Sequence, residues 1–377
     1  MKHDGFDPAA ASATITRRQF VYGAAAVAGL AVMPACVWRH GENPPRAAPA
    51  ALLEALRAED PVVQADAARL LGDLGAPDAV GPLVQYVTHS RHYAKTAGFD
   101  ALARIGDAGC CPQLRPLVEQ PNVPDDDFWY GRTSVQLFAA LTLLALGDNA
   151  GEQRLLDDSS NLHNWAFYTW LAPSVLRLPD HSPAVARVKA RLTTETLRPP
   201  GKSDPAQLAY ITDALGLLGG VSARRALVEL CDNPSRYVRG RASINLLSLS
   251  SQREDVQRVQ RIAADDEALF ARVKAAHALA AHGDRAAVRT IASAVEAAPS
   301  AFDRAAALDS LGVVGEPEHV SVAAAALRSS EAYVRQCAVE ALDRLGTAAA
   351  VQAVRPLRDD PDVRVRLQVA KCLAAAA

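Results

Sequence analysis

A short pattern recurs along most of this chain, and a chain built from such copies folds by stacking them. Residues 60–75 and residues 332–346 share apolar positions spaced three and four apart that end in Leu-Gly. That spacing places the apolar side chains on one stripe of a helix. Glycine directly after the stripe suits the left-handed conformation that ends helices. The pattern therefore predicts an all-α fold of stacked helical units.

The closing residue of the first helix in each copy serves as a landmark. Most landmarks are 31 to 33 residues apart, and the long step from Gly147 to Gly219 is most simply two stretched copies. A second apolar helix and a break such as Asp360-Pro361 follow. We predict an α-solenoid of about ten two-helix repeats over residues 51–377. The landmarks are Gly75, Gly106, Gly147, Gly219, Ser250, Gly283, Gly315 and Gly346.

These copies resemble HEAT repeats, and most closely the short HEAT-like units of the phycobilisome-lyase type. The resemblance is strong over residues 60–106 and 205–377 and poor over residues 120–200. It implies an architecture and is nearly silent on function, because one fold serves many activities. Bilin lyases with such repeats work in the cytoplasm, which conflicts with the export signal described below.

One position of the repeat is basic in most copies. In HEAT proteins the matching arginine commonly pairs with an aspartate of an adjacent repeat, so the resemblance implies a structural brace. A ladder of ligand-binding arginines is the alternative. The first copy has Gln64 at this position and the second has Lys95. The arginines assigned to it are Arg132, Arg239, Arg272, Arg304, Arg335 and Arg364.

The N-terminus has the form of an export signal. The Arg17-Arg18 pair with Phe20 resembles the twin-arginine signal, and an uncharged run over residues 20–38 follows. A short membrane anchor is the alternative, but the run is at the low edge of the length that spans a bilayer. We predict a twin-arginine signal peptide over residues 1–35 and a periplasmic location or one on the outer face of the membrane.

Residues 33–36 (Met-Pro-Ala-Cys) resemble a lipobox with a departure at Pro34. Lipidation of Cys36 is favoured over simple cleavage after Ala35, because such cleavage wants a small residue at position 33. A lipid anchor at Cys36 would be the chain's one contact with a membrane. Residues 36–50 lack apolar periodicity and contain prolines, so we predict a tether.

Charge and cysteine usage exclude several classes of protein. The net charge is −2, and a nucleic-acid surface needs a strong basic excess. The six cysteines form no CxxC or CxxCH motif, which argues against thioredoxin-like, haem and zinc-ribbon sites. We expect the cysteines of the repeats to be buried as small apolar residues; a vicinal disulfide between Cys110 and Cys111 would be strained.

The regular pattern fails over residues 121–200, where aromatic residues gather beside acids, asparagines and a histidine. Such a mixture suits a pocket for a sugar, a ring-bearing cofactor or a peptide. Rings that fill a bend of the array are the alternative. The candidate ligand- or partner-binding residues are Asp125, Asp126, Trp129, Tyr130, His163, Trp165, Tyr168 and Trp170.

Catalytic and cofactor motifs are absent from the sequence. There is no GxSxG, GxxxxGK[ST], GxGxxG after a strand, or HExxH, and no His-Glu dipeptide of the kind repeated in di-iron HEAT hydroxylases. His89 and His92 are three residues apart but have no evident third ligand for a metal. We expect no catalytic residues, no cofactor and no metal.

We therefore favour an exported binding or assembly scaffold that presents a concave face to a protein partner and is accessory to another exported enzyme. The expected contacts are second-helix residues Arg258, Arg261, Arg289 and Arg328. An enzyme or small-ligand binder, lyase-like and centred on residues 121–200, is the alternative. Residues 373–377 end the array with apolar side chains, whereas a cap is usually polar. That end predicts end-to-end contact or a docked partner.

Overall fold

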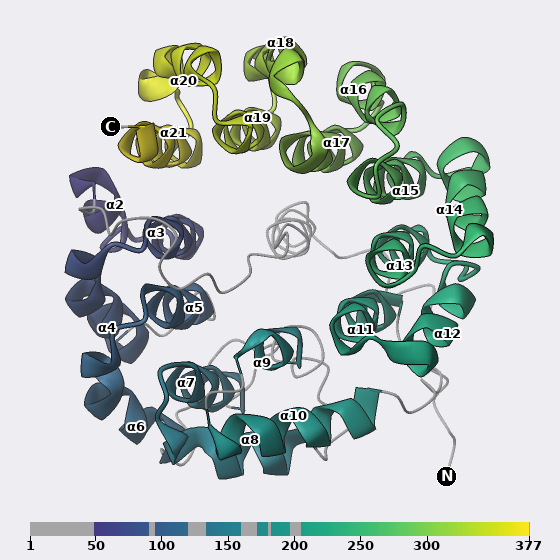
Figure 1. The fold of residues 1–377 in the computed structure, drawn as a ribbon. Helices are drawn as coiled ribbons and strands as arrows, with labels where there is room; N and C mark the ends of the chain where they lie inside the picture. The colour runs from purple at the N-terminus through teal and green to yellow at the C-terminus, as the bar shows by residue number, and fades with distance from the viewer. Residues whose placement is uncertain are drawn as a thin grey trace, which may run out of the picture. The chain divides into compact units, whose positions relative to one another are not determined.

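The computed structural model describes residues 49–89, 95–119, 133–159, 172–179, 182–196 and 205–376. The chain divides into two compact units, residues 1–37 and residues 38–377. All described residues belong to the second unit, which we call the repeat array, and their regular structure is helical throughout (Figure 1). The predicted all-α repeat fold is confirmed.

Each repeat contributes a first helix and a second helix, except that the last described repeat has α21 alone. The first helices are α3 (Pro61–Leu74), α5 (Thr96–Ile105), α7 (Thr133–Ala145), α9 (Ala172–Arg177), α11 (Pro205–Leu218), α13 (Arg236–Leu249), α15 (Leu269–Ala281), α17 (Ala301–Val314), α19 (Ala332–Leu345) and α21 (Val363–Ala376). The second helices are α4 (Val80–His89), α6 (Cys111–Glu119), α8 (Glu152–Ser159), α10 (Pro183–Thr196), α12 (Gly220–Leu230), α14 (Arg253–Asp265), α16 (Ala287–Ala297), α18 (Val320–Ala325) with η8 (Ala326–Arg328), and α20 (Ala348–Val354) with η9 (Arg355–Asp359). Helix α2 (Ala50–Ala55) precedes them. Because α9 packs between α7 and α11, the long step between landmarks does hold two stretched copies.

The landmark residues end the first helices largely as expected. Gly75 and Gly346 have φ angles of 61° and 65°, in the left-handed region that favours glycine. Positive φ angles also occur at Gly106, Gly147, Gly219 and Gly283. Gly315 departs from the prediction, because its φ is −72° and its backbone is extended.

Small residues bring neighbouring first helices close together. A Cβ atom on Gly72 of α3 would lie 2.7 Å from Cα of Ala101 in α5, and one on Gly312 of α17 would lie 2.9 Å from Cα of Ala341 in α19. First helices that approach so closely are spaced more tightly than second helices, so the stack curves toward them. In Figure 1 the first helices accordingly form the inner layer of the repeat array and the second helices the outer layer.

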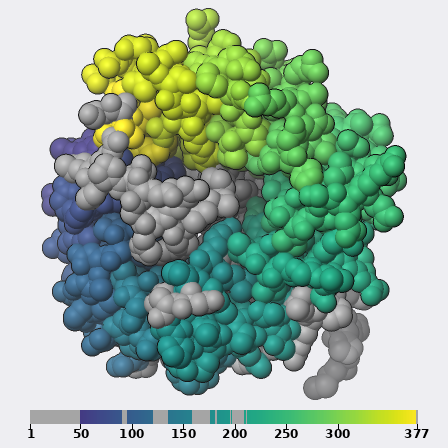
Figure 2. Space-filling model, viewed as in Figure 1, coloured from purple at the N-terminus to yellow at the C-terminus, as the bar shows by residue number. Residues whose placement is uncertain are grey.

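The repeat array closes on itself. Helix α21 packs against α3 and α2, and the apolar core of the first repeats includes Leu367 of α21. Ala374 and Ala375 also pack against that core. The apolar C-terminal end is therefore covered by helices at the start of the array. In Figure 2 the purple residues at the start of the array lie next to the yellow residues at its C-terminal end.

Two further predictions can be compared with the described residues. Cys110, Cys111, Cys231 and Cys372 are buried, Cys337 is half-buried, and all five are free thiols. This confirms the expected burial of the repeat cysteines, and Cys36 lies outside the described residues. Across the same part of the chain, no helix has the length and apolar character needed to cross a membrane.

Candidate functional site

The recurring arginine forms the expected brace at two junctions between repeats. Nε and Nη2 of Arg239 donate to the two carboxylate oxygens of Asp266 at 2.7 and 2.8 Å. Arg335 donates to Asp360 in the same way, with both distances 2.8 Å. Nη1 of each arginine also donates to backbone carbonyls, for example that of Ser329 at 2.9 Å from Arg335. Each brace thus ties a first helix to the loop before the next one.

The carboxylates of the braces are held in their ionised form. Their side chains are 6% exposed at Asp266 and 5% exposed at Asp360. The hydrogen bond from Arg335 lowers the pKa of Asp360 despite the opposing effect of burial. Burial alone would raise the pKa of Asp266, but the bonds from Arg239 and from the Ala268 amide lower it overall. Bidentate, charge-assisted pairs of this kind are among the stronger polar contacts in proteins.

The structure corrects one member of the recurring set. Nη1 of Arg366 donates to the carbonyls of Asp360 and Pro361 at 2.6 and 3.1 Å, which matches the contacts of Arg335. Arg364 instead pairs with nearby Asp362 at 3.0 Å. The assignment of Arg364 was therefore wrong by two residues, because the last copy has two arginines in succession at alternate positions. Arg132 lies outside the described residues.

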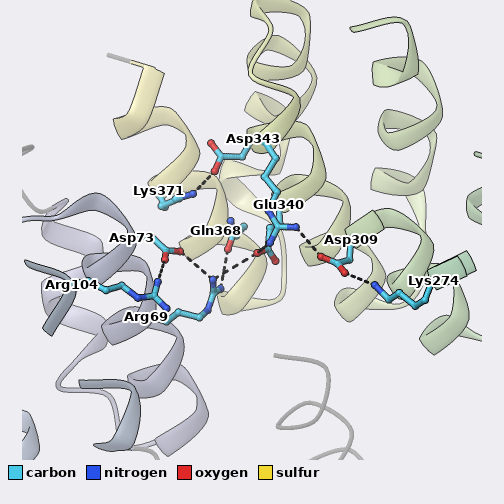
Figure 3. Close-up of polar contacts among 10 residues, drawn as sticks. Arg69, Asp73, Arg104, Lys274, Asp309, Glu340, Asp343, Gln368 and Lys371 are labelled. Carbon is cyan, nitrogen blue, oxygen red and sulfur yellow. Dashed lines mark hydrogen bonds and ion pairs between the residues drawn. The ribbon is translucent and has the colours of Figure 1, made fainter. Parts of the chain in front are cut away.

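Polar and charged side chains line the inner helices two, five or nine residues after the recurring position (Figure 3). Nζ of Lys274 in α15 donates to Asp309 in α17 at 2.6 Å, and Nη1 of Arg344 in α19 reaches the other oxygen of Asp309 at 2.8 Å. Arg344 also pairs with Glu340 at 2.8 Å. We call this set, together with its continuation on α3, α5 and α21, the inner network.

The inner network continues across the contact between α21, at the end of the array, and α3, at its start. Arg69 of α3 donates to Gln368 of α21 at 3.3 Å and lies 3.9 Å from Glu340 of α19. Arg69 also pairs with Asp73, which accepts from Arg104 of α5 (Figure 3). Residues about 300 positions apart in sequence are therefore joined by hydrogen bonds, and Arg69 is the centre of that contact.

Burial and charge have opposing effects on the acids of the inner network. Burial alone would raise the pKa of Asp309, but the ammonium of Lys274 and the guanidinium of Arg344 outweigh it and lower the pKa. Burial lowers the pKa of nearby His277 to about 4, and Lys274 adds to that effect, so the imidazole is neutral at pH 7. The charges of the inner network are thus largely satisfied by one another.

An aromatic cluster lies at the N-terminal ends of three inner helices. The ring centroids of Tyr237 and Phe270 are 5.1 Å apart in an edge-on contact, and those of Phe270 and Phe302 are 5.7 Å apart and stacked. The guanidinium of Arg236 sits 4.9 Å from the Tyr237 centroid. This cluster was not predicted from the sequence, although each ring occupies the residue two before the recurring arginine.

The predicted ligand-binding residues of the irregular segment fall outside the described part of the chain. So does His92 of the histidine pair. Among the residues that the structure does describe, no group of three or more His, Cys, Asp or Glu side chains is placed to hold a metal. The candidates that lie outside the described residues are Asp125, Asp126, Trp129, Tyr130, His163, Trp165, Tyr168 and Trp170.

The second-helix arginines lie on a different side than expected. Helices α14, α16 and η8 are in the outer layer, so their arginines do not face the concave side (Figure 1). The reason is the close approach of the first helices, which places the first helices inside. Arg258 is paired with Asp232 at 2.5 Å. Arg261, Arg289 and Arg328 are exposed.

A comparison with models of protein families agrees with the helical repeat fold. The family model for HEAT repeats matches residues 49–127 and 288–374. No curated protein sequence matches the chain. Similar solved structures include the CpcE–CpcF complex of phycocyanin lyase from Nostoc sp. PCC7120, at 19% identity, covering 81% of this chain and 96% of that chain with a TM-score of 0.33.

Two other solved structures are similar to a comparable degree. Human deoxyhypusine hydroxylase is 20% identical, with 86% of this chain and 93% of that chain covered and a TM-score of 0.33. Kap121p is 13% identical, with 86% and 40% covered and a TM-score of 0.35. Likenesses this weak say nothing about activity or partners.

Proposed function

We propose that this chain is an exported scaffold of HEAT-like repeats that binds a protein partner through its outer helices and serves another exported enzyme as an accessory. The closed array supports the outer location, because the apolar C-terminal end is covered and the described inner charges pair mainly with each other. The outer helices are the remaining repeated surface of the described residues.

The observation that carries this proposal is a set of exposed arginines on the outer layer. None of them forms an ion pair with any residue in the described ranges. Arginine is enriched in protein–protein interfaces, and unpaired positive charge favours a partner with an acidic surface. The set comprises Arg261 of α14, Arg289 of α16, Arg328 of η8, and Arg355 and Arg358 of η9.

Charge reversal tests the binding surface. We expect a variant with Arg261, Arg289 and Arg355 replaced by glutamate to retain its envelope partner about tenfold less than wild type, given a few tenths to one kcal/mol for each exposed charge. The matched control reverses three outer-layer arginines that are already paired with acids, and it changes the net charge equally. These are Arg115, Arg187 and Arg225. Equal capture by both variants would contradict the proposed surface.

Export is a separate part of the proposal and has its own test. Replacing Arg17 and Arg18 with lysine removes the guanidinium pair of the signal but keeps its charge, so we expect the chain to stay in the cytoplasm. Cell fractionation measures this, and delivery to the envelope by the double variant would refute a twin-arginine route. Intact mass of the exported N-terminus, compared with a Cys36→Ala variant, distinguishes lipidation of Cys36 from simple cleavage.

A further inference from the structure

Two consecutive junctions lack the aspartate of the brace. The acids Asp266 and Asp360 stand six residues before the recurring arginine of the following repeat. The same position holds Ala298 before α17 and Ser329 before α19. Ser329 keeps the local role of the aspartate, since its Oγ accepts from the Glu331 amide at 3.3 Å. In the same way, Oδ1 of Asp360 accepts from the amide two residues further on, at 2.9 Å. Ser329 therefore replaces the aspartate as an acceptor for the nearby backbone amide, but it supplies no carboxylate to an arginine.

Arg304, like Arg272, has no brace aspartate, whereas Arg239 and Arg335 each pair with one. Nη2 of Arg304 donates to the carbonyl of Ala298 at 3.0 Å, whereas Arg239 and Arg335 donate to loop carbonyls through Nη1. Its Nε is buried and has no hydrogen-bond partner. A buried donor left unsatisfied is costly, and the cost is greater when the group is charged. The Nε–H bond that a brace aspartate fills at Arg239 and Arg335 is therefore open at Arg304.

A pocket lies beside this unfilled position. It has a volume of about 230 Å³, which is room for several waters or a small ligand group. Arg304, Arg328 and Ser329 line it together with Glu296, so two guanidinium groups face one carboxylate. Its remaining lining is aliphatic and comes from Val295, Val322, Ala325 and Ala326. The pocket thus combines a net positive charge with an apolar wall.

We propose that this pocket binds a carboxylate carried on a short aliphatic stem, with the carboxylate in the place that the brace aspartate occupies elsewhere. The contacts of Arg239 and Arg335 show the geometry: two parallel N–H bonds from Nε and Nη2 to the two oxygens. At Arg304 one Nη2 hydrogen already bonds to the Ala298 carbonyl, so the carboxylate takes the Nε hydrogen and the second hydrogen of Nη2. Arg328 adds positive charge at the exposed rim, and the valines and alanines pack against the stem. A free short-chain acid and a glutamate side chain of a protein share this chemistry.

The site shares Arg328 with the outer arginines proposed to bind a partner, but its test is separate from theirs. Its essential group is Arg304, whereas the charge-reversal variants change neither Arg304 nor Arg328. Failure of the carboxylate site therefore leaves the partner test unaffected, and the reverse is equally true.

Titration of the full-length chain, followed by NMR of the arginine Nε–H groups, tests the site. Two probes are used. Butyrate represents an unattached short-chain carboxylate, and N-acetylglutamate methylamide represents a glutamate residue of a protein. Chloride at equal ionic strength is the reference. We expect the Arg304 resonance, identified by its loss in Arg304→Gln, to move saturably toward the positions of Arg239 and Arg335. The capped residue binding tighter than butyrate would identify a protein side chain as the source, and the opposite order a small acid; both support the site.

Two serine variants make the test specific. Ser329→Asp restores the brace from within the chain, so we expect it to weaken probe binding by about tenfold or more and to raise the midpoint of thermal unfolding. Ser330→Asp adds the same charge at the exposed neighbouring position and should do neither. A resonance that neither probe moves saturably, or that moves equally in wild type and Ser329→Asp, would overturn the proposal.

Discussion

Replacing Asp360 with asparagine tests the brace that joins α19 to α21. Asparagine keeps an oxygen that can accept from the Asp362 amide, as Asn233 accepts from Ser235 at 2.9 Å in another repeat. It removes the negative charge that Arg335 meets through two bonds of 2.8 Å. The substitution therefore isolates the ionic part of the brace from its local capping role.

The magnitude follows from burial. The side chains of Arg335 and Asp360 are 12% and 5% exposed, so little of their attraction is lost to solvent. Removing one member of a buried pair typically costs about 3–5 kcal/mol. Because Arg335 keeps its two carbonyl acceptors and asparagine keeps one oxygen, we expect a loss of about 2–3 kcal/mol in the free energy of unfolding.

Urea unfolding at pH 7 and at low pH measures this effect. Arg335 lowers the pKa of Asp360 in the folded state, so the stabilisation is present above the unfolded pKa of about 3.9 and is lost as the pH falls through the folded pKa. The difference between wild type and Asp360→Asn should therefore shrink in acid. Asp359→Asn, at the exposed neighbouring position, is the matched control and should stay within about 0.5 kcal/mol of wild type. Equal unfolding of the two variants at pH 7 would refute the reasoning.

Two other predictions concern packing. Gly72→Ala should destabilise the array by about 1–3 kcal/mol in urea unfolding, because its Cβ would meet the Ala101 backbone at 2.7 Å. Gly81→Ala, where a Cβ meets nothing within 4 Å, should instead be neutral or stabilising. A loss of unfolding free energy in both variants would contradict the packing argument. In a Cys36→Ser chain, a thiol reagent at pH 8 should label the four buried cysteines only after unfolding, since burial raises the pKa of Cys231 to about 12 and that of Cys110, Cys111 and Cys372 as well. Rapid labelling of any of these four in the native chain would refute their burial.

Local features of the fold were predictable from the sequence, because they depend on a few neighbouring residues. The Leu-Gly ends predicted helix termini, and the recurring Arg239 and Arg335 predicted braces. The missing acids at Ala298 and Ser329 were also visible, six residues before each arginine, but only once the structure had shown which residue pairs with which. The open Nε of Arg304 follows from that register.

Closure of the array and its curvature had no comparable local signal. Closure depends on small rotations summed over all repeats, and no single copy records that sum. Arg69 and Glu340 stand 271 positions apart, so their approach is not evident from either neighbourhood. Curvature follows from the close contact of small residues such as Gly72 and Ala101 between repeats, which a helical period does not reveal. The irregular segment 121–200 remains the place where the sequence predicts a pocket.

Zero-length cross-linking tests most directly whether the array closes through Arg69, on which the outer location of the partner surface depends. In an Arg69→Lys chain, a carbodiimide should couple the new amine to Glu340, and mass spectrometry of the monomer band should find that peptide pair. The native Lys371–Asp343 and Lys274–Asp309 pairs serve as internal controls. A link between residue 69 and Glu340 in the monomer is the predicted result. Efficient coupling of both control pairs without that link would contradict closure.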